Sequence, residues 1–237
     1  MQHESKNRKV MNKMQITALG LCACLLLAGC NSFKNMNNTA KGGIIGGGSG
    51  ATAGAIIGGL IGKGKGAGIG AAIGAAVGAG AGVIIGKKMD KKAEAAAQIE
   101  EAQVEQVTDN NGLAAVKVTF GDNVLFGFNS TALSNDAKAA LRQLAEILRE
   151  DPTTDIAIIG HTDKAGTYEV NMKFSKERAY NVENYLQDCG VSPRQFKEVK
   201  GVAYDEYDET KTAAENRRVE IYMYASEEMI QEAEAQS

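Results

Sequence analysis

The chain contains no tryptophan, and aromatic residues make up only 5% of its 237 positions. Proteins that bind single-stranded nucleic acids stack the bases on aromatic rings, so this composition argues against such a surface. Lysine and arginine number 26 against 29 acidic residues, which leaves a formal net charge of -3. Because there is no basic excess to attract a phosphate backbone, we expect no nucleic-acid partner.

Histidine is scarce as well, with two copies in the whole chain. Only His161 lies outside the N-terminal leader described below. A catalytic metal site needs several His, Cys or carboxylate ligands in a cluster, and the sequence offers none. Neither a histidine beside a nucleophile nor a glycosidase-type carboxylate pair stands out. We therefore expect no metal, no cofactor and no enzymatic activity.

The N-terminus has the pattern of a secretory leader. Basic residues up to Lys13 precede an apolar run over residues 16–27, which is too short to span a bilayer comfortably. The run ends at Leu27-Ala28-Gly29-Cys30, which resembles a bacterial lipobox. We predict a lipoprotein signal peptide over 1–29 and a diacylglycerol on Cys30. The alternative is an ordinary signal peptide with a chance cysteine.

The residues around this cleavage point predict the membrane in which the protein is anchored and the state of its cysteines. In lipoproteins of the enterobacterial kind an aspartate after the cysteine retains the protein at the inner membrane. Asn31 stands there instead, so we expect a lipidated linker over 30–41 anchored in the outer membrane. Cys22 and Cys24 leave with the leader, which leaves Cys189 without a partner for an intrachain disulfide.

Glycine recurs at every fourth position between 42 and 86, with alanine, isoleucine and valine in between. On a helix this spacing produces a groove free of side chains, along which another helix approaches closely. Lys63-Gly64-Lys65 divides the segment into two apolar stretches of about twenty residues, roughly the 30 Å of a bilayer core. We predict a glycine-zipper helical hairpin over 42–87, in or on the membrane; the alternative is a flexible tether.

The remaining chain divides into a connector, a domain and a tail. Residues 88–106 are charged and favour a solvated helix that holds the domain off the membrane. Residues 226–237 are acidic and predict a frayed helix or disorder. Between them, 107–225 has the pattern of an independent α+β domain with helices on one face of a sheet.

Within that domain, alternation and periodicity predict the individual elements. We expect a hairpin formed by strands 115–120 and 124–126, a helix ending at about Arg149, and a strand over 155–160. A second helix over 168–188 follows, closed by Cys189-Gly190, and then strands over 197–201 and 219–224.

Several separated motifs in this domain form one constellation. Gly160-His161-Thr162-Asp163 ends an apolar run, Asn171 and Arg178-Ala179 follow, and Asn216-Arg217-Arg218-Val219-Glu220 comes later. In order and spacing they resemble the OmpA-like peptidoglycan-binding family and its glycine-zipper lipoproteins. Phe174 departs from that pattern, where the family has leucine. The resemblance implies an OmpA-like βαβαβ sandwich for this domain.

The resemblance also implies a binding site. Asp163 and Arg178 match the positions that grip a peptidoglycan stem peptide, where Asp163 would meet the ammonium and Arg178 the carboxylate of diaminopimelate. Asn171 lies two helical turns before Arg178, so both should project from the same face of the helix. The other positions carried over to the cleft are Asn129, Thr162, Arg217 and Arg218, of which one arginine is expected to brace the last strand.

These features together predict a lipid-anchored outer-membrane protein whose periplasmic domain binds peptidoglycan and tethers the membrane to the wall. The alternative is an oligomeric assembly factor or channel-type protein, built by homo-oligomerisation of the glycine zipper and only positioned by the wall-binding domain. The alternative for Asp163 and Arg178 is a mutual salt bridge that stabilises the fold. Exposed pairs of that kind contribute only about 0–1 kcal/mol, so binding is the favoured interpretation.

Overall fold

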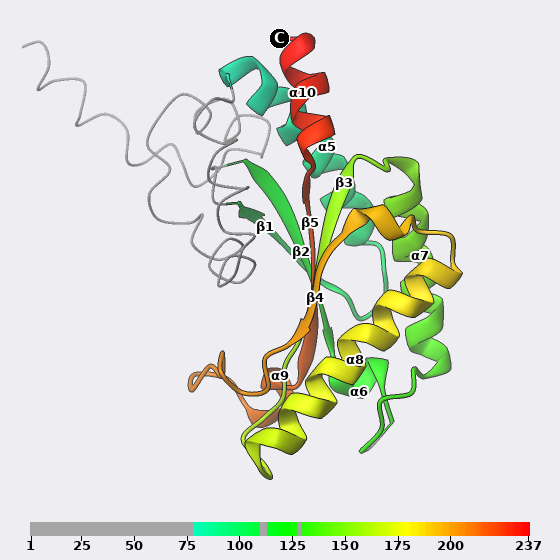
Figure 1. Ribbon diagram of the computed structural model, residues 1–237, viewed down its shortest axis with the longest axis vertical. Coiled ribbons are helices and arrows are strands. Elements are labelled where there is room, and N and C mark those ends of the chain that lie inside the picture. The colour runs from blue at the N-terminus through cyan, green and yellow to red at the C-terminus, as the bar shows by residue number, and fades with distance from the viewer. Residues whose placement is uncertain (1–77, 110–112, 128) are drawn as a thin grey trace, which may run out of the picture. The chain divides into compact units, whose positions relative to one another are not determined.

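The computed structural model describes residues 78–109, 113–127 and 129–237 (Figure 1). The predicted signal peptide, the lipidation site Cys30, the linker 30–41 and the ladder up to residue 77 lie outside the described residues. No helix among the described residues has both the length and the apolar character needed to cross a bilayer.

A five-stranded sheet organises the described residues, in the order β1-β2-β5-β3-β4. The strands are β1 (Gln103–Thr108), β2 (Ala114–Gly121), β3 (Thr154–Gly160), β4 (Phe196–Gly201) and β5 (Arg218–Ala225). Neighbours are antiparallel except β3 and β4, which are parallel. A parallel pair needs a long crossover, and α8 (Tyr168–Asp188) supplies it. The last strand, β5, therefore lies at the centre of the sheet.

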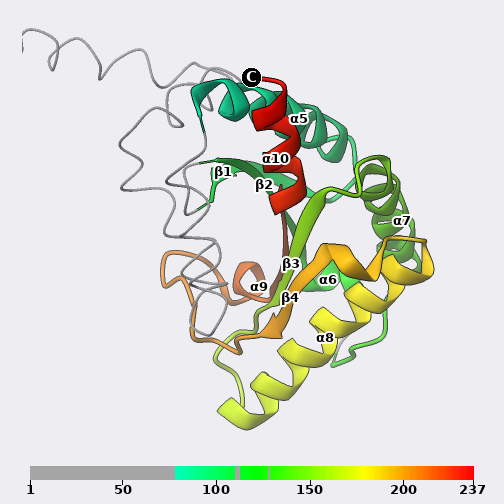
Figure 2. The same cartoon turned by 45° about the horizontal axis from the view of Figure 1, so that its top comes forward.

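Helices α7 (Asn135–Glu150) and α8 cover the same face of the sheet (Figures 1 and 2). The Ser134 side chain caps α7 by accepting a hydrogen bond from the backbone N–H of Ala137. Apolar residues at helical spacing on α7 are fully or almost fully buried against the sheet: Ala137, Leu141, Leu144, Ala145 and Leu148. This α+β sandwich is the fold class that the sequence predicts, and both helices end where expected.

The expected hairpin of strands 115–120 and 124–126 is wrong. β2 pairs instead with β1 on one side and β5 on the other. Residues 122–125 form the short helix α6 (Asp122–Leu125), and Leu125 is completely buried. Because both edges of β2 are already occupied, the apolar residues after Gly121 turn into the core rather than pairing back.

The expected solvated connector is also wrong. Residues 79–96 form one helix, α5 (Ala79–Ala96), which packs against β2, α7 and the C-terminal helix. Its buried stripe recurs every third or fourth position: Ala81, Ile85, Met89, Ala93 and Ala96. Lys92, only 6% exposed, donates to Asp151 Oδ2 at 2.8 Å, and Lys91 pairs with Glu150 at 3.3 Å. The stripe crosses the point where the glycine ladder meets the charged segment, which conceals it in the sequence.

The tail is ordered too. Ser226 caps α10 (Glu227–Ala235), which buries Met229, Ile230 and Ala233 against α5 and the end of β5. Glu232 of this helix lies 3.6 Å from Lys88 of α5. α5 and α10 therefore join the core from the two ends of the described chain, and the folded domain extends well beyond the predicted 107–225.

Candidate functional site

Two glycines let α8 approach the ends of β3 and β4. A Cβ on Gly160 would lie 2.1 Å from the carbonyl oxygen of Ser175, and one on Gly201 would lie 2.2 Å from the amide nitrogen of Lys176. Any side chain at these positions would push the helix away from the strands. The Ser175 hydroxyl also accepts a hydrogen bond from the backbone N–H of Ala203 at 3.0 Å. This contact brings the face of α8 that carries Asn171 and Arg178 to the strand ends.

The loop after β3 is built around Asp163 and Asn171. Asp163 Oδ1 accepts a hydrogen bond from the backbone N–H of Ala165 at 2.9 Å. Asn171 Nδ2 donates to the carbonyl of Ala165 at 2.8 Å, and Gly166 adopts φ +88° to complete the turn. Asn171 is 7% exposed, so its amide closes the loop that presents Asp163 rather than standing open to solvent.

Four charged side chains meet beside this loop and form what we call the charged cluster: Asp122, Asp163, Arg178 and Arg217. Arg217 Nη1 donates to Asp163 Oδ2 at 2.5 Å, and Arg217 Nε lies 3.5 Å from Asp122 Oδ2. Arg178 Nη2 lies 2.9 Å from Asp122 Oδ1. Asp163 and Arg178, the two residues singled out from the sequence, therefore belong to one cluster. They are linked through Arg217 and Asp122 and form no direct ion pair.

Arg178 is held from several sides at once. Its Nε and Nη2 donate to the carbonyl of Ser130 at 3.1 and 3.0 Å. Its guanidinium carbon lies 4.9 Å from the ring centroid of Phe126 and 5.4 Å from that of Phe174. Phe174, which departs from the family's usual leucine, thus supplies a second cation–π contact. The guanidinium is preorganised, and only 7% of its side chain is exposed.

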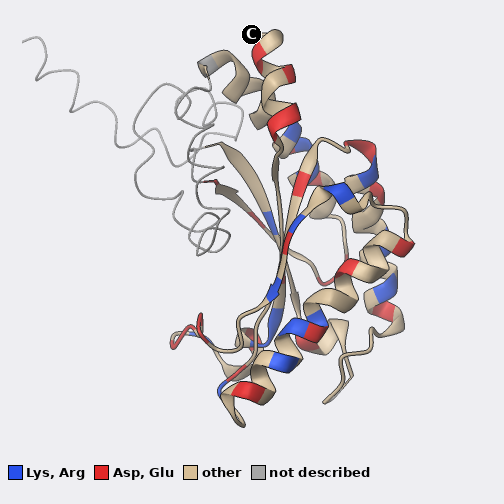
Figure 3. Ribbon diagram, in the orientation of Figure 1, with Lys and Arg blue, Asp and Glu red and all other residues tan. Residues whose placement is uncertain are grey.

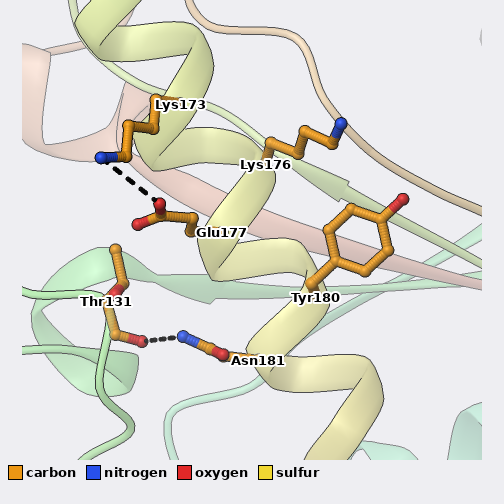
Figure 4. Close-up of a pocket in the computed structure, with 6 residues that line it drawn as sticks. All are labelled: Thr131, Lys173, Lys176, Glu177, Tyr180 and Asn181. Atoms are coloured by element: carbon orange, nitrogen blue, oxygen red, sulfur yellow. Dashed lines mark hydrogen bonds and ion pairs between the residues drawn. The ribbon is translucent and has the colours of Figure 1, made fainter.

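The loop that carries Ser130 is anchored from α8. Asn181 Nδ2 donates to the carbonyl of Thr131 at 2.7 Å, at one side of a hollow on the outer surface of α8 (Figure 4). Lys173, Lys176, Glu177 and Tyr180 line the rest of this hollow. It contains none of the site residues predicted from the sequence. Its link to the charged cluster is the hydrogen bond from Asn181 to the Thr131 carbonyl. Thr131 follows Ser130, whose own carbonyl accepts the hydrogen bonds from Arg178.

Asn129 and Thr162 take no part in the charged cluster through any hydrogen bond found here. Asn129 is exposed and adopts φ +51°, a left-handed conformation that asparagine tolerates better than most residues. Thr162 is 4% exposed, and its backbone N–H donates to the carbonyl of Ala203 at 2.8 Å. Both residues shape the loops that flank the site.

The two adjacent arginines have separate surroundings. Arg218 Nε donates to Glu220 Oε1 at 2.7 Å, while Tyr222 donates to Glu220 Oε2 at 2.6 Å. His161 Nε2 lies 3.5 Å from the same carboxylate. Burial alone would raise the pKa of Glu220, but these three neighbours hold it well below its ordinary value. We call these residues the strand cluster; within it Arg218 contacts Glu220 of the same strand, β5.

Asp122 is the cluster member that sequence reasoning missed. Its Gly-Asp-Asn context resembles a turn, and nothing local connects it to residues 217 and 178. The pairing of Gly121 with Arg218, and a 2.9 Å hydrogen bond from the Asp122 N–H to the Arg217 carbonyl, bring it there. Burial raises the pKa of Asp122 in spite of the two arginines, and burial likewise lowers the pKa of Arg178.

The site is neither a metal centre nor a basic surface in the described ranges. No group of three or more His, Cys, Asp or Glu side chains there is arranged to hold a metal ion. Figure 3 shows acidic and basic residues interspersed along α7 and α8. Chemically, the charged cluster offers one carboxylate and one guanidinium, those of Asp163 and Arg178. A second such pair, Asp122 and Arg217, lies between them.

Comparison with known proteins agrees with this architecture. Residues 125–220 match the model of the OmpA family, and residues 11–90 match the YMGG-like Gly-zipper. The chain is 37% identical over 116 residues to outer membrane protein A of Bordetella avium, covering 47% of this chain and 59% of the relative. It is 34% identical over 82 residues to a peptidoglycan-associated lipoprotein of Rhizobium meliloti, covering 35% and 47%.

Among solved structures, a MotB-like protein from Desulfovibrio vulgaris matches with a TM-score of 0.50 and 21% identity, over 59% of this chain and 92% of that one. That similarity shows the fold. The chain spans about half the length of the curated relatives it matches. The matches of residues 125–220 to the OmpA model and of residues 11–90 to the YMGG-like Gly-zipper model confirm the resemblance that the sequence motifs predicted.

Proposed function

We propose that this protein binds peptidoglycan non-covalently through the diaminopimelate of the stem peptide. The single observation that carries the proposal is the charged cluster, in which Asp163 and Arg178 are both shielded and are linked through Arg217 and Asp122. A side chain that ends in an ammonium and a carboxylate has the complementary pair of charges. Arg178 suits a carboxylate because its guanidinium is permanently charged and is already oriented by two aromatic rings and by the Ser130 carbonyl.

We further propose that lipid on Cys30 anchors the chain in the outer membrane, so that the domain links membrane and wall from the periplasm. A relative carrying the name peptidoglycan-associated lipoprotein supports both halves of this proposal. A single acyl attachment holds a membrane only marginally, so the glycine ladder is expected to add to the hold. Because α5 contains the last residues of the ladder and packs into the domain, the chain passes from the ladder into the domain without a linker.

The test is co-sedimentation of the purified full chain with isolated cell-wall sacculi. Wild-type protein should pellet with the sacculi, whereas Asp163→Asn and Arg178→Ala should stay in the supernatant. Release of soluble wall fragments would instead indicate a hydrolase. Equal pelleting of all three proteins would refute the assignment of these residues. Fractionation of cells carrying Cys30→Ala tests the lipid anchor, because a smaller share of the protein should remain in the membrane fraction than in wild type.

A further inference from the structure

Asp122 raises a question that the proposed function leaves open. Arg178 is expected to receive the ligand's carboxylate, yet a carboxylate of the protein already lies against it, at 2.9 Å. Asp122 comes from α6, at the end of β2, and is unrelated in sequence to the motif that carries Asp163 and Arg178. An incoming anion must therefore either displace Asp122 or bind beside a like charge.

We propose that Asp122 is an internal stand-in for the ligand's carboxylate. It neutralises Arg178 in the free protein, releases it when the ligand binds, and thereby restricts the site to ligands that carry both an ammonium and a carboxylate. This inference rests on the proposed function, which it deepens by assigning the residue that determines ligand selectivity.

The first support is geometric. The cluster is a linear series of alternating charges: Asp163, Arg217, Asp122 and Arg178, joined by contacts of 2.5, 3.5 and 2.9 Å. A ligand ammonium would pair with Asp163 at one end of the series, and a ligand carboxylate would pair with Arg178 at the other. The two inner residues, Arg217 and Asp122, already face each other and remain paired. A doubly charged ligand thus replaces both outer contacts and leaves no protein charge without a partner.

The second support is charge balance in a shielded site. The four charges cancel in the free protein, and they still cancel after a ligand with one positive and one negative group has bound. A ligand with only an ammonium would leave one excess positive charge among side chains that are 7% to 36% exposed. Unbalanced charge is costly where water is partly excluded, so such a ligand is disfavoured.

The third support is that Asp122 is held less completely than a purely structural carboxylate. Its Oδ1 is buried and accepts no hydrogen bond, although Arg178 lies close by. Glu220 in the neighbouring strand cluster, by contrast, accepts hydrogen bonds on both oxygens. An anion that is desolvated but incompletely bonded is poised to exchange partners at modest cost.

The experiment compares two synthetic tripeptides, L-alanyl-γ-D-glutamyl-diaminopimelate and the same peptide with lysine in third position. Lysine keeps the side-chain ammonium and lacks only the carboxylate on the carbon that bears it; the other carboxylates are the same in both peptides. Their binding to the full chain in detergent is measured by calorimetry for wild type and Asp122→Asn. We expect wild type to prefer the diaminopimelate peptide. Removing the competing charge should raise affinity for that peptide about fivefold and leave lysine binding unchanged or weaker.

The matched control is Asp155→Asn, which removes the same charge from a side chain of similar exposure, 14% against 17%, at the opposite end of β3. It should leave both affinities as in wild type. Unchanged or reduced affinity of Asp122→Asn for the diaminopimelate peptide would overturn the stand-in role while leaving the proposed function intact. If wild type binds neither peptide, the proposed function itself fails.

A second measurement does not depend on the variant's folding. In wild-type protein, the carboxyl carbon resonance of Asp122 should shift on addition of the diaminopimelate peptide, because its partner Arg178 is withdrawn. The lysine peptide should leave that resonance in place. A carboxyl resonance that stays fixed while the diaminopimelate peptide binds would contradict the exchange of partners.

Discussion

Arg217 and Arg218 are adjacent in sequence, yet the two clusters they join differ in almost every respect. In the strand cluster Glu220 is 7% exposed and accepts hydrogen bonds on both oxygens, and Arg218 is 11% exposed. In the charged cluster Arg217 is 36% exposed, and Asp122 Oδ1 accepts no hydrogen bond. Arg217 immediately precedes β5 and its backbone is extended, so its side chain and that of Arg218, the first residue of β5, leave the chain on opposite sides. The closed cluster suits structural bracing, and the open one has capacity left for a ligand.

The largest expected effect on binding separates the two clusters. Asp163→Asn should weaken binding of the diaminopimelate peptide by about 2 kcal/mol or more, roughly 30-fold, because it removes the carboxylate proposed to hold the ligand ammonium. Glu220→Gln should leave that affinity nearly unchanged once folding is confirmed. Calorimetry on both variants measures the contrast, and equal losses would remove the distinction between the clusters.

Stability should show the reverse pattern. Arg218→Ala leaves Glu220 buried without its arginine, which should cost about 3 kcal/mol in the free energy of unfolding. Arg217→Ala should cost markedly less, because its side chain is one-third exposed. Urea denaturation of the two variants provides the measurement, and a larger loss for Arg217→Ala would contradict the assignment.

The strand cluster should also govern stability in acid. The pKa of Glu220 is depressed in the folded protein, so its contribution is present above its ordinary value of 4.5 and is lost as pH falls below it. The free energy of unfolding of the wild type should therefore fall as the pH drops below about 5. The Glu220→Gln variant should show a smaller fall over the same range. Thermal unfolding at a series of pH values tests this, and parallel curves would exclude Glu220 as the source.

The smallest expected effect concerns Asp155, at the far end of β3. Burial raises its pKa from 3.8 to about 6, against the opposing influence of Lys197. Holding it ionised therefore costs stability above pH 6, and the cost disappears below 3.8. Asp155→Asn should stabilise the protein by about 1 kcal/mol at pH 7.5 and hardly at all at pH 4. Equal stabilisation at both values would point to another cause.

Much of the domain follows from local pattern. The limits of α8 match the expectation residue for residue, because Thr167 caps it and Cys189-Gly190 ends it. β3 and β5 follow from apolar alternation and β-branched residues. Asp163, Arg178 and Arg217 of the charged cluster could be predicted from the family motif, because the motif residues occur at nearly fixed spacing.

The elements that were missed depend on partners distant in the chain. α5 looks solvated because Lys88, Lys91 and Lys92 dominate its sequence, but their partners are Asp151, Glu150 and Glu232. Residues 124–126 look like a strand because they are apolar, and only the occupied edges of β2 exclude that pairing.

The sequence by itself thus determined the fold class, the order of the central elements and the residues of the family motif, since each depends on spacing and capping along the chain. Tertiary structure alone decided that α5 and α10 complete the core, that Arg217 and Arg218 enter different clusters, and that Asp122 forms an ion pair with Arg178. The physical reason is that ion pairs and buried helix faces are formed between segments brought together by sheet pairing, over separations that no local pattern encodes.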